Sequence, residues 1–181
     1  TLMSRLGRIN LRSVKRDERF NPLLENLARR ITPELKNFGH RGVANVMHAL
    51  AKLKEPRKDI MLAVDEDASW LVGNGTPQNI ANTAWAFAKL KIPSASLLKN
   101  IEAQPSSAVN VKVQPNDIGN VAWAFATTNT PAPNLFRKID ADFGKMMKKN
   151  GKHSPIAVGN IAWAFATQKF PSPSIFKPIE E

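Results

Sequence analysis

The chain has 181 residues, of which 43 % are hydrophobic, enough to bury the core of one compact domain or a short repeat array. Lys and Arg number 26 against 15 Asp and Glu, and this charge of +11 favours a polyanionic partner or an anionic neighbour in a larger assembly, unless the protein is simply basic. The absence of cysteine excludes disulfides, zinc knuckles and thiol chemistry, and the absence of 18 consecutive apolar residues predicts no membrane insertion.

Residues 1–20 are interpreted as a basic N-terminal arm or a degenerate segment. The first 16 residues contain no acid and five cations, namely Arg5, Arg8, Arg12, Lys15 and Arg16. This composition resembles the end of an organelle-targeting peptide, which is rich in Arg and poor in acid, and it also fits a retained basic arm. Residues 21–181 are predicted to form a repeat array. It begins with Leu23, Leu24 and Leu27, whose spacing predicts the second helix of a preceding unit.

One motif recurs four times around the reference residues Asn45, Asn82, Asn120 and Asn160, which are 37, 38 and 40 residues apart. The copies read GVANVMHALAKLKEP, NIANTAWAFAKLKIP, DIGNVAWAFATTNTP and AVGNIAWAFATQKFP. A proline follows each Asn by eleven residues, and another precedes the last three by five residues. The period predicts units near 38–75, 76–113, 114–153 and 154–181, the last of them incomplete.

Each motif is predicted to form the first helix of its unit, with a proline in the first turn and another that ends the helix. In the second copy, Ile80, Ala84 and Phe87 share one face, and Trp85 lies near Ala81 and Ala88 on an adjacent face. A helix with two apolar faces is typically sandwiched between neighbours.

A second helix is predicted after each terminating proline, because apolar residues recur 15, 16 and 19 positions after the reference Asn. This spacing gives one apolar stripe and an outer, wetter face. Ser94 and Ser172 are candidate N-caps, and Pro105 is predicted to shorten the second of these helices. The segments 73–77 and 148–153 are predicted loops. Stacked units of this kind predict an all-α fold, an α-solenoid of helix-turn-helix repeats.

The segments PQNIANTAWAFAKLKIP and QPNDIGNVAWAFATTNTP, at this period, resemble octotricopeptide repeats, helical hairpins of algal and other protist organelle proteins. The resemblance covers roughly residues 23–181. The first unit departs from the pattern, because His48 and Leu50 replace the aromatic residues. The resemblance implies sequence-directed binding of RNA in a chloroplast or mitochondrion.

The polar side of each first helix is the predicted ligand surface. It holds three positions per unit, four before, at and seven after the reference Asn. The candidate RNA-binding residues are Arg41, Asn45 and Lys52; Gln78, Asn82 and Lys89; and Asn116, Asn120 and Thr127. The fourth unit has Ile156, Asn160 and Thr167 at these positions. Side chains that differ in donors and acceptors can discriminate bases, one per repeat, while lysines hold phosphates.

Structural alternatives accompany each of these assignments. The repeated Asn can bond to the backbone or to its neighbour in the next unit, forming a ladder. The tryptophans can stack on bases, but their position near the alanines favours core packing. His48 is predicted to be a packed histidine. The clusters Arg57–Lys58 and Lys145, Lys148, Lys149 and Lys152 either contact a polyanion or form solvated faces.

No constellation for catalysis is evident, so we predict a non-catalytic protein without a cofactor, a metal or a small-molecule substrate. The histidines are scattered, the acids at 65–67 have no partner base, and the segment GNGTP lacks the Lys of a phosphate loop. Two hypotheses remain: an organellar module that binds single-stranded RNA or rRNA, and a scaffolding subunit of a large organellar assembly that acts through protein contacts.

Overall fold

The computed structural model describes residues 15–110, 112–150 and 154–172, with residues 144–150 described by their backbone alone. Within these ranges the secondary structure is entirely helical, as predicted. The α-helices are α3 (Phe20–Ile31), α4 (Gly39–Leu53), α5 (Lys58–Glu66), α6 (Ala68–Asn74), α7 (Pro77–Leu90), α8 (Ala95–Ala103), α9 (Pro115–Thr127), α10 (Pro133–Asn150) and α11 (Pro155–Thr167). Two 3-10 turns, η1 (Leu35–Phe38) and η2 (Pro105–Ser107), connect them.

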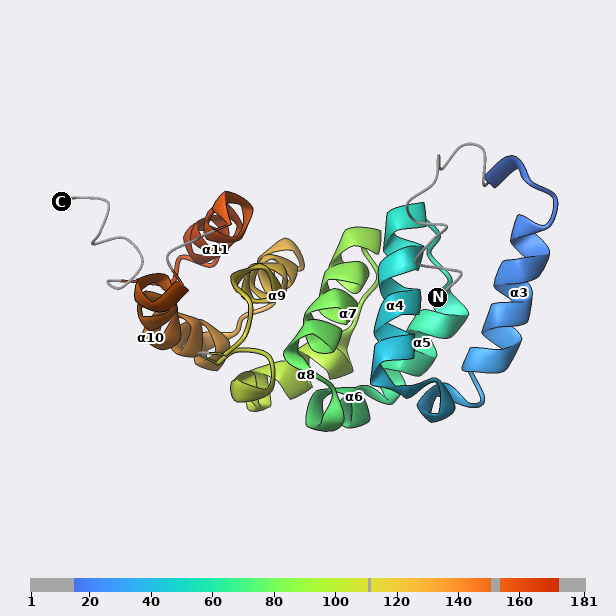
Figure 1. Cartoon of the computed structure of the whole chain (residues 1–181), viewed down its shortest axis with the longest axis horizontal. Helices are drawn as coiled ribbons and strands as arrows, with labels where there is room; N and C mark the ends of the chain where they lie inside the picture. Colours follow the sequence, from blue (N-terminus) through green and yellow to red (C-terminus); the bar gives the residue numbers. More distant parts are fainter. Residues whose placement is uncertain (1–14, 111, 151–153, 173–181) are drawn as a thin grey trace.

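The four predicted first helices are α4, α7, α9 and α11, and they lie in a row (Figure 1). Helix α4 packs against α7, α7 against α9, and α9 against α11. The second helices follow the same order, since α8 contacts α5 and α6 on one side and α10 on the other. Each unit therefore packs on its neighbours in the chain. Within the described ranges, no helix is long and apolar enough to span a bilayer.

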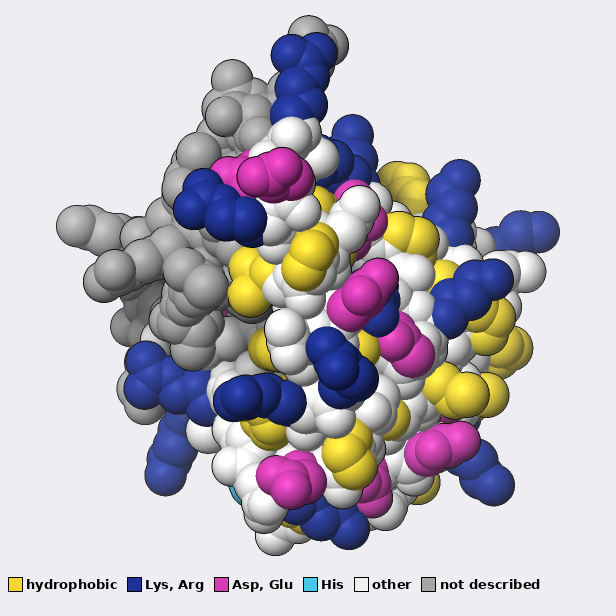
Figure 2. All heavy atoms as spheres, turned by 90° about the vertical axis from the view of Figure 1, so that its right-hand side faces the viewer, with side chains coloured by type: hydrophobic (Ala, Val, Ile, Leu, Met, Phe, Trp, Pro, Cys, Tyr) yellow, Lys and Arg dark blue, Asp and Glu magenta, His cyan; other side chains and the backbone are white. Residues whose placement is uncertain are grey.

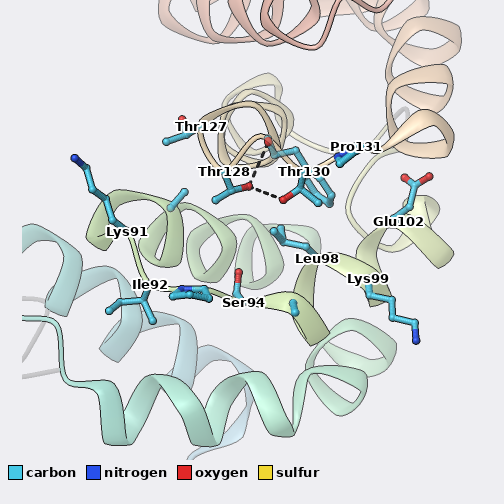
Figure 3. A pocket seen from close by; sticks show the side chains of 14 residues that line it. Lys91, Ile92, Ser94, Leu98, Lys99, Glu102, Thr127, Thr128, Thr130 and Pro131 are labelled. Carbon is cyan, nitrogen blue, oxygen red and sulfur yellow. Dashed lines mark hydrogen bonds between the residues drawn. The ribbon is translucent and has the colours of Figure 1, made fainter.

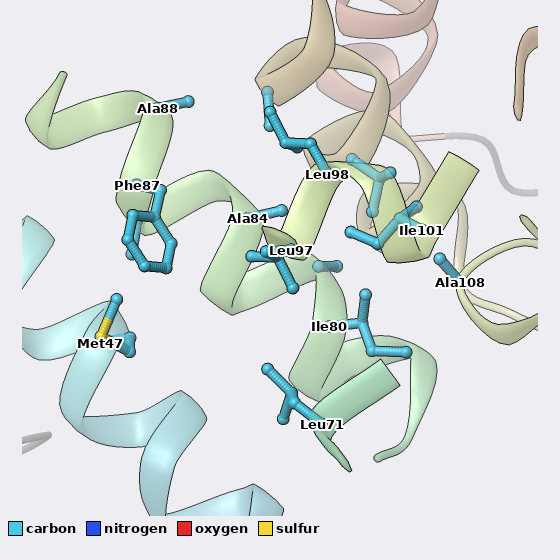
Figure 4. Packing of buried hydrophobic residues seen from close by; sticks show 14 of the residues in the cluster. Met47, Leu71, Ile80, Ala84, Phe87, Ala88, Leu97, Leu98, Ile101 and Ala108 are labelled. Carbon is cyan, nitrogen blue, oxygen red and sulfur yellow. The ribbon is translucent and has the colours of Figure 1, made fainter. Parts of the chain in front are cut away.

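The core runs along the row between the two sets of helices. Phe87 of α7 is fully buried and points toward Met47 of α4, while Ile80 lies near Leu71 of α6 (Figure 4). On the second helices the predicted stripe is confirmed for three units: its buried members are Ile60, Met61 and Val64; Leu97, Leu98 and Ile101; and Leu135, Phe136 and Ile139. The fourth set lies outside the described residues.

Small residues allow the first helices to approach one another closely. A Cβ atom added at Gly119 of α9 would lie 3.2 Å from the Cα atom and 3.3 Å from the carbonyl oxygen of Ala157 in α11. The equivalent residue of α7, Ala81, is fully buried. This position, just before the reference Asn, therefore sets how tightly consecutive first helices pack.

Each first helix ends in the same turn, which the sequence analysis did not anticipate. The residue nine positions after the reference Asn has a left-handed backbone in every unit: Lys54, Lys91, Asn129 and Lys169, with φ between 51° and 56°. The N–H of the following residue bonds to a carbonyl five residues back, as from Ile92 to Phe87 at 3.1 Å. This is a Schellman motif, which usually places glycine at the left-handed position.

Acidic side chains near the ends of the second helices join consecutive units. The carboxylate of Asp65 accepts the backbone N–H groups of Ser96 and Leu97 at the start of α8, and that of Glu102 accepts those of Asn134 and Leu135 at the start of α10. Asp65 and Glu102 both stand 20 residues after their reference Asn. Asp140, at the same register, bonds to the hydroxyl of Ser172.

Several details of the sequence prediction need correction. The second helix of the first unit is followed by a separate helix, α6, which contains Gly73 and Asn74 of the predicted loop. Residues 148–150, also predicted as loop, extend α10. Ser94 occupies the N-cap position of α8 but makes no capping hydrogen bond, because Asp65 caps that helix instead. Pro105 follows the end of α8, as predicted.

Candidate nucleic-acid interface

Each first helix presents one narrow side to solvent. In α7 this side consists of Gln78, Asn82, Trp85 and Lys89, which lie within about 60° of one another around the helix axis. Gln78 and Lys89 are exposed, and Asn82 and Trp85 are half-buried. We call the four equivalent sets the first-helix stripe: Arg41, Asn45, His48 and Lys52; Gln78, Asn82, Trp85 and Lys89; Asn116, Asn120, Trp123 and Thr127; and Ile156, Asn160, Trp163 and Thr167.

The structure brings all nine candidate RNA-binding residues together on this stripe. The outer positions are exposed in every unit, at the start of the helix and near its end. The reference Asn is half-buried in every unit. Consecutive first helices pack on one another, and the same three positions recur in each of them.

The reference asparagines make no side-chain hydrogen bond to any described residue. The ladder that the sequence allowed as a structural role is therefore not formed among the described residues. An amide has two donor hydrogens and an acceptor oxygen. Four such groups, in register and reachable from solvent, are available to an external ligand.

The tryptophans lie partly on the stripe, and the predicted core packing is confirmed for two of the three, Trp85 and Trp123. Trp85 and Trp123 are half-buried and pack on the core with part of each ring accessible, and Trp163 is 46 % exposed. The reason is geometric, because the position three residues after Asn82 lies about 60° around the helix, between Asn82 and buried Ala81. A large ring at this position therefore contacts both the core and the solvent.

His48 replaces tryptophan in the first unit and packs on the stripe. Its ring centroid lies 5.3 Å from that of Trp85, and Lys52 Nζ lies 5.9 Å from the centroid of Trp85. Partial burial lowers the pKa of His48, and the nearby Lys52 ammonium lowers that pKa further. A neutral imidazole therefore prevails at neutral pH, beside a ring that holds a cation over its face.

Charge decreases along the stripe from α4 to α11. The first two units supply Arg41, Lys52 and Lys89, whereas the last two have Thr127 and Thr167 at the lysine position. The last unit also exposes Ile156 by 74 %. At the α3 end of the row, by contrast, acidic and basic side chains are interspersed (Figure 2). Arg41, Lys52 and Lys89 are therefore exposed at the α4 end of the stripe, and none of the stripe residues is acidic.

The basic features outside the stripe contribute less. Arg57 is engaged by Asp59, with an N–O distance of 2.7 Å, and this pairing raises the pKa of Arg57 and lowers that of Asp59. Lys58 is exposed. The side chains of Lys145, Lys148 and Lys149, and all of Lys152, lie outside the described part of the chain.

No group of three or more His, Asp or Glu side chains in the described ranges is arranged to hold a metal ion. The acids at 65–67 have structural partners, since Asp65 caps α8 and Asp67 pairs with Lys36 at 3.3 Å. Comparisons with protein-family models, curated proteins and solved structures find no match to this chain. The site itself therefore carries the functional argument.

Proposed function

We propose that this chain is a non-catalytic α-solenoid module that binds single-stranded RNA along the first-helix stripe. The resemblance to octotricopeptide repeats supports a role in RNA metabolism within a chloroplast or mitochondrion, with a messenger or ribosomal RNA as the target. The row of first helices, in which each packs on the next, supports the solenoid arrangement.

The observation that carries this proposal is the set of four reference asparagines. Each of these residues is half-buried, and its amide has no hydrogen bond to a described residue and remains reachable from solvent. Asn is suited to recognition of a base edge because its amide donates and accepts at once. A repeated amide with free hydrogen-bonding capacity supports repeated contacts with bases.

The residues around each Asn have complementary roles. Trp85 and Trp123 expose part of a ring next to the amide, and a base stacked on such a ring contributes about 1–3 kcal/mol. Lys52 and Lys89 lie one helical turn after His48 and Trp85, where an ammonium group can neutralise a phosphate. The residue one turn before the Asn is Arg41, Gln78 or Asn116; Arg41 suits guanine, whereas Gln78 and Asn116 both suit adenine.

A second function, protein scaffolding, is favoured by one observation at the α11 end. Ile156 and Trp163 are 74 % and 46 % exposed, and the stripe there carries no charge. An exposed apolar pair on an uncharged surface suits a protein contact. In an assembly that contains RNA, the α4 end would hold the nucleic acid and the α11 end would hold a protein.

The test is binding of the purified chain to a pool of short single-stranded RNAs at several salt concentrations. Neutralising three phosphates with Arg41, Lys52 and Lys89 predicts a slope of log K against log salt of roughly −2. The Lys89→Thr variant, which carries the residue of the third unit, should reduce this slope by about 0.7. Binding without sequence preference, and with the slope unchanged in Lys89→Thr, would contradict the proposal and favour the scaffold.

A further inference from the structure

A cavity of about 760 Å³ opens between the second and third units (Figure 3). One wall is the turn from α7 to α8, with Lys91, Ile92 and Ser94, together with Leu98 of α8. The opposite wall is formed by the end of α9 and the turn that follows it. Its lining residues there include Phe125, Thr127, Thr128, Thr130 and Pro131. The volume is within the range of sites that hold small organic ligands.

The cavity exists because the third unit has small side chains in this turn. Eight and ten residues after the reference Asn, it has Thr128 and Thr130, whereas the second unit has Leu90 and Ile92, which pack against the core. The fourth unit has Gln168 and Phe170 there. Phe170 lies 5.7 Å from Phe136 between ring centroids, and Gln168 donates a hydrogen bond to the carbonyl of Phe125 at 3.3 Å. The corresponding space between the third and fourth units is therefore occupied.

The cavity contains a buried polar group without a partner. Ser94 is only 4 % exposed, and its hydroxyl makes no hydrogen bond because Asp65 already caps α8. Figure 3 shows this hydroxyl directed into the cavity. The hydroxyls of Thr128 and Thr130 are satisfied by each other and by the carbonyl of Ala124. Leaving a buried hydroxyl unpaired is unfavourable, and a ligand with a matching polar group would remove this penalty.

We infer that this cavity takes one nucleobase, turned out of the RNA strand that the first-helix stripe holds. This inference rests on the proposed function and adds to it a second kind of base contact. The lining combines apolar surfaces, such as Ile92, Leu98 and Pro131, with a single buried hydroxyl, which suits a flat heteroaromatic ring with a polar edge. Ser94 then pairs with that edge.

The cavity is continuous with the stripe. Thr127 is the last stripe residue of α9 and also lines the cavity, so a strand that passes Asn120 and Trp123 reaches its mouth. Lys91 and Lys99 stand at its rim, both exposed, where they can neutralise the phosphates on either side of an extruded nucleotide. The acid at the rim, Glu102, is engaged at the start of α10.

The test uses the four nucleoside 5′-monophosphates as probes and follows the backbone amide signals of the full chain by NMR. We expect at least one nucleotide to shift the signals of Ser94, Leu98, Thr128 and Thr130. The double variant Thr128→Leu, Thr130→Ile, which installs the side chains of the second unit, should weaken this binding at least roughly tenfold. Ser94→Ala should weaken it about fivefold, as expected for one hydrogen bond, while Ser96→Ala, on the exposed side of α8, should leave it unchanged.

The nucleotide-binding test of the cavity and the RNA-binding test of the first-helix stripe can fail independently. If no nucleotide shifts these signals, the inference is wrong whatever the affinity for RNA. It is also wrong if the double variant Thr128→Leu, Thr130→Ile, which fills the cavity, binds nucleotides as tightly as the native chain does. If nucleotides occupy the cavity but RNA binding is insensitive to the stripe residues, the cavity assignment stands and the proposed function fails. Circular dichroism checks that the double variant Thr128→Leu, Thr130→Ile is folded. If it is not folded, the nucleotide affinity of Ser94→Ala tests the inference instead.

Discussion

Asp65 at the end of α5 accepts the backbone N–H of Leu97 in α8 at 2.8 Å, and thereby caps a helix that belongs to the next unit. Glu102 does the same for Leu135 in the following unit at 3.0 Å. The carboxylate compensates for donors that the helix itself leaves unpaired, and its charge interacts favourably with the N-terminal end of the helix dipole. Stacking of the second helices is thus specified by a hydrogen bond as well as by apolar contact.

We expect Asp65→Ala to lower the free energy of unfolding by about 0.5–2 kcal/mol, the usual cost of losing an N-terminal cap. Glu66→Ala is the matched control, because Glu66 is exposed and should change stability by less than about 0.5 kcal/mol. Urea denaturation measures both. Equal effects of the two substitutions would show that the inter-unit cap contributes nothing.

Gly119 and Gly159 occupy the same register position in α9 and α11 but differ in surroundings. A Cβ atom at Gly119 would press on the backbone of Ala157, whereas a Cβ atom at Gly159 would meet nothing within 4 Å. Gly119→Ala should therefore destabilise the chain by about 1–3 kcal/mol through overpacking. Gly159→Ala should stabilise it by roughly 0.5–1 kcal/mol through helix propensity. Thermal unfolding distinguishes them, and a gain at both positions would mean that α9 and α11 do not pack this closely.

The left-handed lysines offer a test of the turn. Lys91 has a φ of 56°, which costs a residue with a side chain about 1–2 kcal/mol relative to its ordinary conformations. Lys91→Gly should therefore stabilise the chain by up to about 1 kcal/mol. Asn129→Gly should gain less, because Asn tolerates this conformation better than Lys. A loss of stability in Lys91→Gly would contradict the assigned turn.

The titration of His48 reports on the stripe directly. Burial and Lys52 both lower the pKa of His48, so the folded state disfavours the protonated ring. Stability from the neutral ring is complete above the unfolded pKa, about 6.5, and decreases as the pH falls from there toward the folded pKa. Lys52→Thr, the residue of the last two units, should raise the pKa of His48 without restoring it fully, since burial remains. NMR titration of the imidazole measures this, and an unchanged pKa would place Lys52 away from the ring.

The repeat in the sequence was sufficient to predict the first helix of each unit and the order of the units, but not the separate helix α6. Proline in the first turn of α7 and the period of the apolar residues fixed that helix closely, because both act locally. The left-handed turns were missed because Lys54, Lys91 and Lys169 are not residues that usually mark such a turn. The capping role of Asp65 was missed because its partners lie 31 and 32 residues away and the bond forms only after the units stack.

The residues of the candidate site and their shared side of the helix were predicted from the sequence, but the burial of the tryptophan rings was not. The sequence placed Gln78, Asn82 and Lys89 on one side of a helix, and the structure has them there. It could not decide how far a ring at position 85 reaches from the core to the surface, since that depends on the neighbouring helix. The cavity beside Thr128 could not be predicted for the same reason, because it depends on the sizes of side chains that two neighbouring units turn toward each other.

The measurement that most directly tests the central claim compares RNA affinity and thermal stability in the double variant Asn82→Ala, Asn120→Ala, with Asn21→Ala of α3 as the control on an exposed site. Because neither amide is bonded within the described structure, the melting temperature should stay constant or rise slightly, Ala being the better helix former. Affinity for single-stranded RNA should fall about tenfold or more, since each base contact is worth about 1–3 kcal/mol. A double variant that binds RNA as the native chain does but melts at a lower temperature would contradict the account, because the asparagines would then be structural.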